Sequence, residues 1–301
     1  LNYKLYVFFM IIWLASYPKS GNTWLRTIIG HFFEEIENES DVFKASKKIR
    51  AYPYKNDFIE LDEIFKDDKF TENNKKSIIE STIKNWIPSQ SKINLNDQIN
   101  ILKTHNMLCK INLENTDYSF SDLENTLGII HIVRDPRNIL TSLKNHFSID
   151  DDKEALDFIF RENNWIGFRE NRIPEFLSSW KSHYNSWKRF PKNNLLVKYE
   201  DLLFDTKNQI IRLKDYFSNF IDIKISEEKI MKIISNTSFE NFQKQEKNNR
   251  FDENAFSEML GKKKIFFNLG PKNDWKKILD KETSILIENS FRSELIELGY
   301  L

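Results

Sequence analysis

An apolar run that stops at a proline and gives way to a helical pattern is the feature that most constrains this chain. Leu5 to Ala15 is rich in Val, Ile, Phe and Trp, which is typical of a strand buried on both faces of a parallel sheet. Pro18 cannot continue such a strand. Apolar residues then recur at helical spacing, at Trp24, Leu25, Ile28, Ile29, Phe32 and Phe33. The segment therefore predicts a strand, a loop and a helix that begins close to Ser20.

The loop between this strand and helix carries groups that suit an anion. Lys19 offers a positive charge, Ser20 and Thr23 offer hydroxyl donors, and Gly21 lets the backbone approach a ligand closely. The free N–H groups at the start of the helix point toward the same place. In a Walker A loop the lysine directly follows a glycine, whereas here Lys19 precedes Gly21. We interpret the segment as a phosphate-binding loop of another kind.

Composition limits the class of protein. A chain of 301 residues can bury one large α/β core, and 45 basic against 45 acidic residues leave no net field that would attract nucleic acid or an anionic membrane. Cys109 is the single cysteine, and the five histidines form no Cys/His pairs at zinc spacing. The apolar run before Ser16 is too short to span a bilayer. We therefore expect a cytoplasmic, metal-free chain without nucleic-acid partners or stable membrane insertion.

Two further strands are expected to end in charged or polar residues. Asn100 to Thr104 is a short apolar strand, and alternation places Lys103 and His105 on one face at its carboxyl end. Leu127 to Val133 runs into Arg134, after which Asp135 and Pro136 are typical of an N-cap and a first helical position. Ser142 then lies about two turns into that helix. In open α/β sheets, ligands bind at the carboxyl ends of the strands.

The rest of the chain gives coarser expectations. Glu37 to Phe70 is interpreted as a long polar covering segment, with a role in a substrate lid as one interpretation. The other expectations are a helix from Glu72 to Trp86 that Pro88 ends, a helix with an aromatic face from Pro174 to Phe190, a strand entering a helix between Leu195 and Leu203, and a charged loop from Gln243 to Leu269.

Several of these segments together resemble one family. The string Tyr17 to Trp24 closely resembles the 5′-phosphosulfate loop of the cytosolic-type sulfotransferases, which use 3′-phosphoadenosine 5′-phosphosulfate (PAPS). Lys103-Thr104-His105 resembles the catalytic triplet of that family, and the interval from Arg134 to Ser142 resembles its 3′-phosphate motif. The strand and helix around Tyr199, the segment Asn236 to Phe239, and Gly270 to Trp275 are similar to further family signatures.

The resemblance implies a single α/β domain, over residues 1–301, with a central parallel sheet flanked by helices and a P-loop-like phosphosulfate loop. It implies His105 as the general base, Lys19 at the leaving oxygen and Lys103 at the transferred group. The residues implied to bind PAPS, or its product PAP, are Lys19, Ser20, Gly21, Asn22, Thr23, Trp24, Arg134, Ser142, Tyr199, Thr237, Phe239, Asn268, Leu269, Gly270 and Lys272. The acceptor is implied to be a small molecule with a hydroxyl group, an alcohol or a phenol among others.

The sequence also departs from the family pattern near its end. Asn268-Leu269 stands where the family has the Arg-Lys pair that binds the 3′-phosphate, and Asn273 stands where the family has a second glycine. Lys272 or the run Lys262 to Lys264 is the candidate substitute. The usual dimer signature just beyond is absent, which leaves the oligomeric state open.

Two alternatives remain at this point. One is a small-molecule kinase with a P-loop, although neither a Walker A lysine nor a magnesium-binding acidic residue is found in place. The other is a nucleotide-binding relative that has lost catalysis, for which the change at Asn268-Leu269 would be the evidence. Met10 stands where many similar chains begin, so Leu1 to Phe9 is a candidate upstream extension.

Overall fold

The computed structural model of the chain describes residues 11–35, 41–66, 71–93, 99–147, 149, 151–168, 172–253, 256–257, 262–263 and 265–301. Contacts divide these residues into two compact units. The first unit comprises 11–17, 50–131 and 161–196, and the second comprises 18–49, 132–160 and 197–301. Leu1 to Phe9, the candidate extension, and Lys264 lie outside the described residues.

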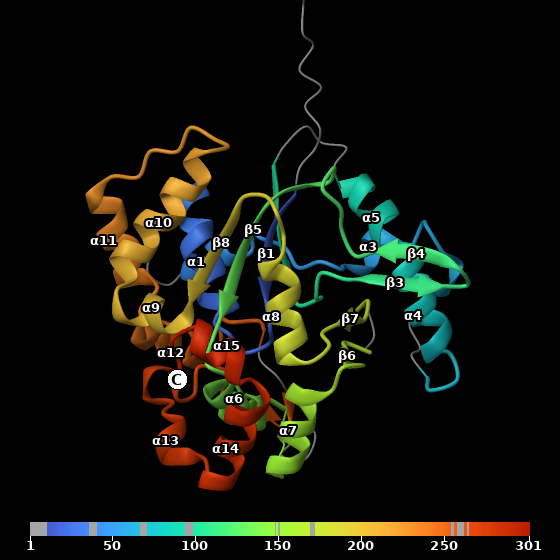
Figure 1. The fold of residues 1–301 in the computed structure, drawn as a ribbon. Helices are drawn as coiled ribbons and strands as arrows, with labels where there is room; N and C mark the ends of the chain where they lie inside the picture. The colour runs from blue at the N-terminus through green and yellow to red at the C-terminus, as the bar shows by residue number, and fades with distance from the viewer. Residues whose placement is uncertain are drawn as a thin grey trace, which may run out of the picture. The chain divides into compact units, whose positions relative to one another are not determined.

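The first unit is built on a parallel four-stranded sheet in the order β2-β1-β5-β8 (Figure 1). Its strands are β1 (Ile11–Ser16), β2 (Asn100–Thr104), β5 (Thr126–Val133) and β8 (Asn194–Lys198). β1 pairs with β2 in parallel register, from Ile11 opposite Asn100 to Ala15 opposite Thr104. All six residues of β1 are buried, as the apolar run predicted. The α/β class and the central parallel sheet are thus confirmed.

Trp13 lies at the centre of the first unit's core. Its side chain is fully buried, and its ring centroid lies 5.3 Å from that of Tyr52 and 5.2 Å from that of Phe120. A buried indole N–H needs a partner, and the Nε1 atom donates to the hydroxyls of Ser121 and Thr126, at 3.2 Å each. The indole of Trp13 thus lies in an aromatic core and keeps its polar atom hydrogen-bonded.

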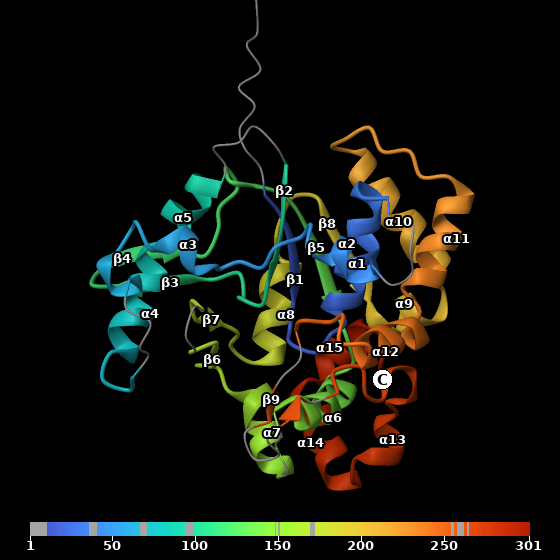
Figure 2. The ribbon, with the colours of Figure 1, turned by 180° about the vertical axis from the view of Figure 1, so that it is seen from behind.

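Among the residues that the structure describes, two hairpins and five helical segments complete the first unit. The hairpins pair β3 (Lys110–Leu113) with β4 (Thr116–Ser119), and β6 (Trp165–Ile166) with β7 (Glu175–Phe176). The helical segments are α3 (Lys55–Phe58), η2 (Glu63–Phe65), α4 (Lys75–Lys84), α5 (Trp86–Ile93) and α8 (Trp180–Lys188). Figures 1 and 2 show α3, α4 and α5 gathered around the hairpin of β3 and β4.

Two expected helices of this unit need correction. Pro88 does not end a helix but lies in the first turn of α5, where the missing N–H has no intrahelical acceptor to lose. The chain breaks at Asn85 instead, between α4 and α5. The helix expected from Pro174 begins only at Trp180, because Glu175 and Phe176 form β7 and Ser178 adopts a left-handed φ of 58°.

The second unit is mainly helical. It contains α1 (Asn22–Phe33), α2 (Val42–Ser46), α6 (Pro136–Phe147), α7 (Asp152–Phe160), α9 (Tyr199–Phe204), α10 (Thr206–Ser218), α11 (Glu227–Asn236), α12 (Phe239–Lys247), β9 (Phe256–Ser257), β10 (Lys262–Lys263), η4 (Gly270–Lys272), α13 (Trp275–Ile278), α14 (Lys281–Ser290) and α15 (Arg292–Glu297). α10 packs against α1, α9 and α11 (Figure 2). The loop expected from Gln243 is helical as far as Lys247, the end of α12.

Phenylalanines form a separate core in the second unit. Phe43 stacks on Phe242 with ring centroids 5.1 Å apart, and Phe251 and Phe267 join the same cluster. Trp24 packs against this cluster from the first turn of α1. The helix after the predicted anion loop is thus fixed by aromatic packing.

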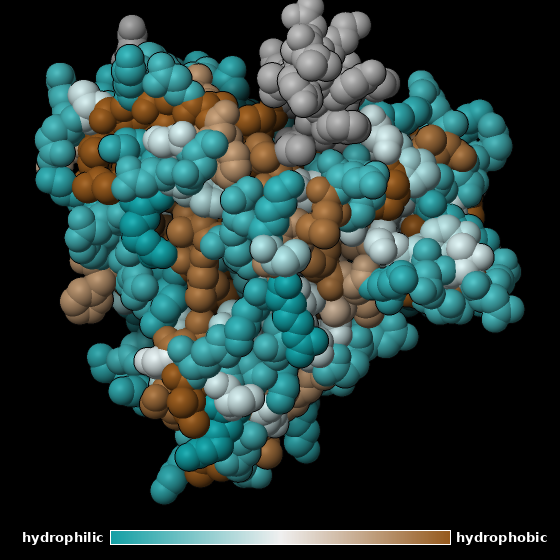
Figure 3. Space-filling view, turned by 45° about the horizontal axis from the view of Figure 1, so that its top comes forward, coloured by the Kyte–Doolittle hydropathy of each residue, from teal (hydrophilic) through white to brown (hydrophobic). Residues whose placement is uncertain are grey.

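The surface mixes charged and apolar residues. On the face drawn in Figure 3, hydrophilic residues predominate and hydrophobic ones form smaller groups between them. In the part of the chain that the structure describes, no helix has the length and apolar character needed to cross a membrane.

Candidate active site

The predicted anion loop leads directly into α1. Lys19 and Gly21 both adopt left-handed backbone conformations, with φ of 68° and 97°. A Cβ atom on Gly21 would lie 2.6 Å from the Tyr199 ring, so a larger residue would be both strained and displaced. Left-handed residues that alternate with right-handed ones can aim neighbouring backbone N–H groups into one concave space. The local chain therefore folds as the predicted strand, loop and helix, and its role as an anion loop stays a prediction.

Arg134 lies against this loop. Its Nη1 atom donates to the Lys19 carbonyl at 3.1 Å, and its guanidinium lies 4.2 Å from the centroid of the Tyr199 ring. Two polar atoms in the same place are buried without any hydrogen-bond partner among the described residues, Nε of Arg134 and the Ser20 hydroxyl. Buried donors normally have partners. Together with Lys19 they make a cationic cradle that suits the phosphate and sulfate groups of an anionic ligand.

Lys19 is a buried lysine of the second unit whose ammonium has a lowered pKa. Burial and then the nearby Arg134 charge lower the pKa of the Lys19 ammonium to about 8, although Glu246 and Glu253 act in the opposite sense. The Nζ atom also lies 4.0 Å from the centroid of the Phe266 ring. An anion bound beside this ammonium would raise its pKa again.

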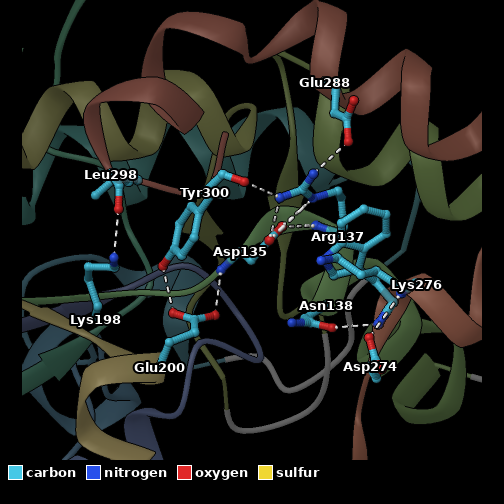
Figure 4. Close-up of polar contacts among 11 residues, drawn as sticks. Asp135, Arg137, Asn138, Lys198, Glu200, Asp274, Lys276, Glu288, Leu298 and Tyr300 are labelled. Atoms are coloured by element: carbon cyan, nitrogen blue, oxygen red, sulfur yellow. Dashed lines mark hydrogen bonds and ion pairs between the residues drawn. The ribbon is translucent and has the colours of Figure 1, made fainter. Parts of the chain in front are cut away.

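A network of charged residues supports the turn that carries Arg134 (Figure 4). Asp135 caps α6 as predicted, because its Oδ1 accepts from the Arg137 N–H at 2.9 Å. Glu200 accepts from the Asp135 N–H at 3.1 Å and from the Tyr300 hydroxyl at 2.6 Å. Burial raises the pKa of Tyr300 well above its ordinary value, so this hydroxyl keeps its proton.

Arg137 extends the same network to the end of the unit (Figure 4). It donates to Asp135, to Glu288 at 2.6 Å and to the Tyr300 carbonyl at 2.8 Å. Its guanidinium also lies 4.0 Å from the centroid of the Trp275 ring. A guanidinium with three such partners is rigid, so the turn between β5 and α6 holds Arg134 in a fixed position.

Aromatic residues expected near an adenine belong to the same unit. The Trp24 ring meets that of Tyr199 edge-on, with centroids 5.8 Å apart. Phe239 contacts Gly270, where a Cβ atom would lie 2.1 Å from the Phe239 ring and φ is 50°. The Thr237 hydroxyl donates to the Ile233 carbonyl at 2.8 Å, so its hydrogen is already used. Asn22 is buried, and Ser142 is half-buried on α6.

The segment that departs from the family pattern is anchored by its unusual asparagine. Asn273 is 8% exposed, accepts from the Thr141 hydroxyl at 2.7 Å and donates to the Asn138 carbonyl at 2.9 Å. Trp275 N–H donates to the Asn138 side chain at 3.0 Å. The asparagine thus fastens this segment to α6, which a glycine could not do.

Other residues of that segment are exposed. Asn268 and Leu269 face solvent, and so does Lys272 on η4. Lys262 and Lys263 belong to β10, and Lys264 is not described. Of the lysines considered as substitutes for the missing Arg-Lys pair, Lys272 is the one that lies in the same short helix as Gly270.

Glu253 was not predicted but contacts the anion loop. It pairs with the buried Arg26 of α1, and the Thr23 hydroxyl lies 3.4 Å from its Oε2. No local motif marks this glutamate, because it lies more than 220 residues after its partners in the chain.

The first unit holds the other predicted catalytic residues. Lys103 lies in β2, and His105 directly follows the strand. The Nδ1 atom of His105 lies 2.7 Å from the Ser16 carbonyl oxygen, which can only accept. Nδ1 therefore carries the hydrogen, and Nε2 is the basic nitrogen of the neutral ring. This tautomer fits a general base.

Both units thus carry chemistry that defines a class. A loop with cationic and hydroxyl side chains before a helix, an arginine after β5 and a histidine after β2 fit α/β enzymes that transfer a group from a nucleotide. Among the described residues, no group of three or more His, Cys, Asp or Glu side chains could hold a metal ion.

Comparison with known proteins assigns the family. The sulfotransferase domain family matches residues 11–299, and the chain belongs to that family. Sulfotransferase 1E1 of Rattus norvegicus is 25% identical over 233 residues, 75% of this chain and 64% of the rat protein. The human protein of the same name is 26% identical over 271 residues, 87% of this chain and 76% of its own. The chain thus spans less than two thirds of the rat protein.

A solved structure shares the fold. Retinol dehydratase in complex with androsterone and the inactive cofactor PAP matches with a TM-score of 0.58 and 19% identity, over 95% of this chain and 80% of that one. At this identity the match supports the fold, which agrees with the parallel sheet and flanking helices described above.

Proposed function

We propose that the chain is a PAPS-dependent sulfotransferase, with residues 1–301 acting as one sulfotransferase domain. The observation that carries the proposal is the cationic cradle of Lys19, Ser20 and Arg134, in which two buried donors have no partner among the described residues. Membership of the sulfotransferase domain family supports the same conclusion.

PAPS would supply an activated sulfuryl group. Its 5′-phosphosulfate and its 3′-phosphate are the two anionic groups that cationic residues would bind. Lys19, Ser20 and the N–H groups of the loop before α1 would hold the 5′-phosphosulfate end. Arg134 and Ser142 would hold the 3′-phosphate, and Trp24 and Phe239 would contact the adenine. The unpaired Trp24 Nε1 atom is a further buried donor in this part of the unit.

Catalysis would depend on proton removal and charge neutralisation. His105 would take the acceptor's hydroxyl proton at Nε2, since Nδ1 is bound to the Ser16 carbonyl. Lys19 would neutralise charge on the leaving oxygen, and Lys103 would assist at the transferred group. Sulfuryl transfer resembles phosphoryl transfer in needing mainly positioning and charge stabilisation, so we use that template by analogy.

The acceptor would be a small molecule with a hydroxyl group. The retinol dehydratase complex, which contains androsterone, supports a small molecule as the acceptor class. We propose the cytoplasm as the compartment, without nucleic-acid partners. A panel of alcohols and phenols, followed by a metabolite extract of the source cell, would identify the acceptor.

The kinase alternative receives less support than sulfuryl transfer. The family match favours the sulfotransferase, and the loop places Lys19 before Gly21 in a left-handed conformation unlike the order of a Walker A lysine. An inactive relative remains a second candidate, because Asn268 and Leu269 are exposed and replace the expected cations.

A thermal-shift experiment with PAP and ATP tests the proposal. We expect PAP at a hundred times its Kd to stabilise the fold by about 2.7 kcal/mol, and ATP at the same concentration to give a much smaller shift. Transfer from PAPS to an accepted phenol should be unchanged by EDTA, because Lys19 and backbone donors neutralise the leaving group.

Three outcomes would contradict this expectation in different ways. A larger shift with ATP, or transfer that stops with EDTA and returns with Mg²⁺, would favour the kinase. Binding of PAP without transfer to any acceptor of the panel or extract would favour the inactive relative.

The 3′-phosphate gives a second prediction. Arg134→Ala should weaken PAP binding by about ten- to hundredfold, because a hydrogen bond to a charged group contributes roughly 1.5–3 kcal/mol. Lys272→Ala should weaken it less, since this side chain is exposed. Affinity for adenosine 5′-phosphosulfate, which lacks the 3′-phosphate, should change little in both variants. Isothermal titration calorimetry of both ligands measures the difference.

Lys277→Ala is the matched control, because Lys277 is a neighbouring exposed lysine that pairs with Asp274. It should leave both affinities unchanged. Equal losses for the two ligands in Arg134→Ala would show that Arg134 does not recognise the 3′-phosphate. If Lys272→Ala has no effect while Lys262→Ala or Lys263→Ala weakens PAP binding, those lysines provide the compensation instead.

A further inference from the structure

Glu175 is a partly buried carboxylate that contacts both predicted catalytic residues of the first unit. Its Oε2 atom accepts from the His105 backbone N–H at 2.6 Å. Its Oε1 atom lies 3.7 Å from Nζ of Lys103, and both side chains are only 13% exposed. One side chain from β7 thus fixes two residues at the carboxyl end of β2.

The hairpin that carries Glu175 is itself fastened to the same turn. The Phe176 N–H donates to the Asn106 side chain at 2.8 Å, and the Met107 N–H donates to the Phe176 carbonyl at 2.7 Å. Phe176 also stacks on Trp165 of β6, with ring centroids 4.8 Å apart. Glu175 therefore reaches His105 from a strand that is itself hydrogen-bonded to the residues just after His105.

Two more buried groups complete the support of His105. Nε2 of His183 lies 3.2 Å from the His105 carbonyl, and burial lowers the pKa of His183 to about 3, so its ring is neutral and donates through Nε2–H. The Trp187 Nε1 atom donates to the Asn106 carbonyl at 2.9 Å. The backbone around the base is thus held at its N–H by Glu175 and at its carbonyl by His183.

We infer that Glu175 is a positioning residue, which holds the His105 backbone and orients Lys103 for the transfer step. The inference rests on the proposed function. The carboxylate faces a backbone donor and a lysine, so its role is to fix the direction of the basic nitrogen and of the ammonium. A displacement of about 1 Å at such a group can lower the rate by about 10²-fold.

Two substitutions separate the two contacts. Glu175→Ala removes both, and we expect kcat to fall by about 10- to 100-fold while KM for PAPS stays within about threefold. Glu175→Gln keeps an oxygen for the His105 N–H but loses the charge beside Lys103, so kcat should fall by less. In a Lys103→Ala background, Glu175→Gln should have no further effect, which a double-mutant cycle measures.

Glu162→Gln is the matched control. Its carboxylate accepts from Ser178 and Ser179, at 2.7 and 2.8 Å, in the same unit as Glu175. These serines are hydrogen-bond partners other than Lys103 and His105, so this variant should keep the wild-type kcat. Wild-type kcat in Glu175→Ala, or an equal fall in Glu162→Gln, would overturn the positioning role.

Amide hydrogen exchange separates this inference from the proposed function. The His105 N–H should exchange slowly in the wild type and in Glu175→Gln, and much faster in Glu175→Ala. Fast exchange in the wild type would overturn the contact itself. If the exchange pattern is as expected but the wild type transfers no sulfuryl group, the proposed function fails and the positioning contact stands.

Discussion

Replacing His105 by asparagine will lower kcat by about 10²- to 10⁴-fold and leave PAP affinity within a few-fold of the wild type. An asparagine side-chain N–H can still donate to the Ser16 carbonyl as Nδ1 does, so the local fold keeps its hydrogen bond. What the variant lacks is the basic nitrogen, and a general base contributes about this factor to the rate. Single-turnover kinetics and PAP titration measure the two quantities.

His105→Ala provides the comparison. It loses both the base and the bond to Ser16, so kcat should be as low as in His105→Asn, with a lower melting temperature in addition. Turnover of His105→Asn at the wild-type rate would show that another group takes the proton. A parallel loss of PAP affinity would assign His105 a role in binding.

Much of the fold followed from local patterns. The buried strand β1, the loop and α1 were predicted because the apolar run, Pro18 and the helical spacing of apolar residues are all local signals. Asp135 and Pro136 marked the start of α6 for the same reason, since a cap acts within one turn. Local signals in the sequence therefore predict the elements that position Lys19 and Arg134.

The helices that were wrong show where local patterns fail. Pro88 looks like a helix end by itself, yet it is tolerated in the first turn of α5. The aromatic spacing after Pro174 suits a helix, but Glu175 and Phe176 pair with β6 in a hairpin instead. The break at Asn85 decides where α5 begins, and the pairing of β6 with β7 decides where α8 begins. The spacing of apolar residues contains neither kind of information.

The contacts that complete the candidate site are distant in the chain. Glu175 lies 70 residues from His105, and Thr141 lies 132 residues from Asn273. In the sequence, Asn273 only marks a position where the family has a glycine. The structure shows that its side-chain oxygen and nitrogen both form hydrogen bonds with residues of α6. No spacing rule links such pairs, so positioning residues of this kind appear only in the folded chain.

Lys19→Ala will reduce both PAP affinity and kcat, and Lys19→Arg will recover affinity better than rate. The ammonium lies next to Arg134 in a cradle with unpaired donors, so its loss removes the compact charge expected at the leaving oxygen. A guanidinium restores the charge but distributes it over a plane, with different reach. Equal recovery of both parameters in Lys19→Arg would show that Lys19 acts only as a distant charge.

The lowered pKa of Lys19 makes the same prediction depend on pH. In the free protein the pKa is about 8, chiefly because of burial. PAP is an anion and binds the protein when Lys19 is protonated. Below pH 8 Lys19 is already protonated, so its titration should not change the affinity for PAP. Above pH 8, binding requires proton uptake, and Kd should rise by about tenfold per pH unit until the higher pKa of the complex is reached. Lys19→Arg should abolish this rise between pH 8 and 9.5, because a guanidinium does not titrate there. A wild-type Kd that stays constant to pH 9.5, or a Kd that rises equally in Lys19→Arg, would show that the protonated Lys19 side chain does not bind PAP.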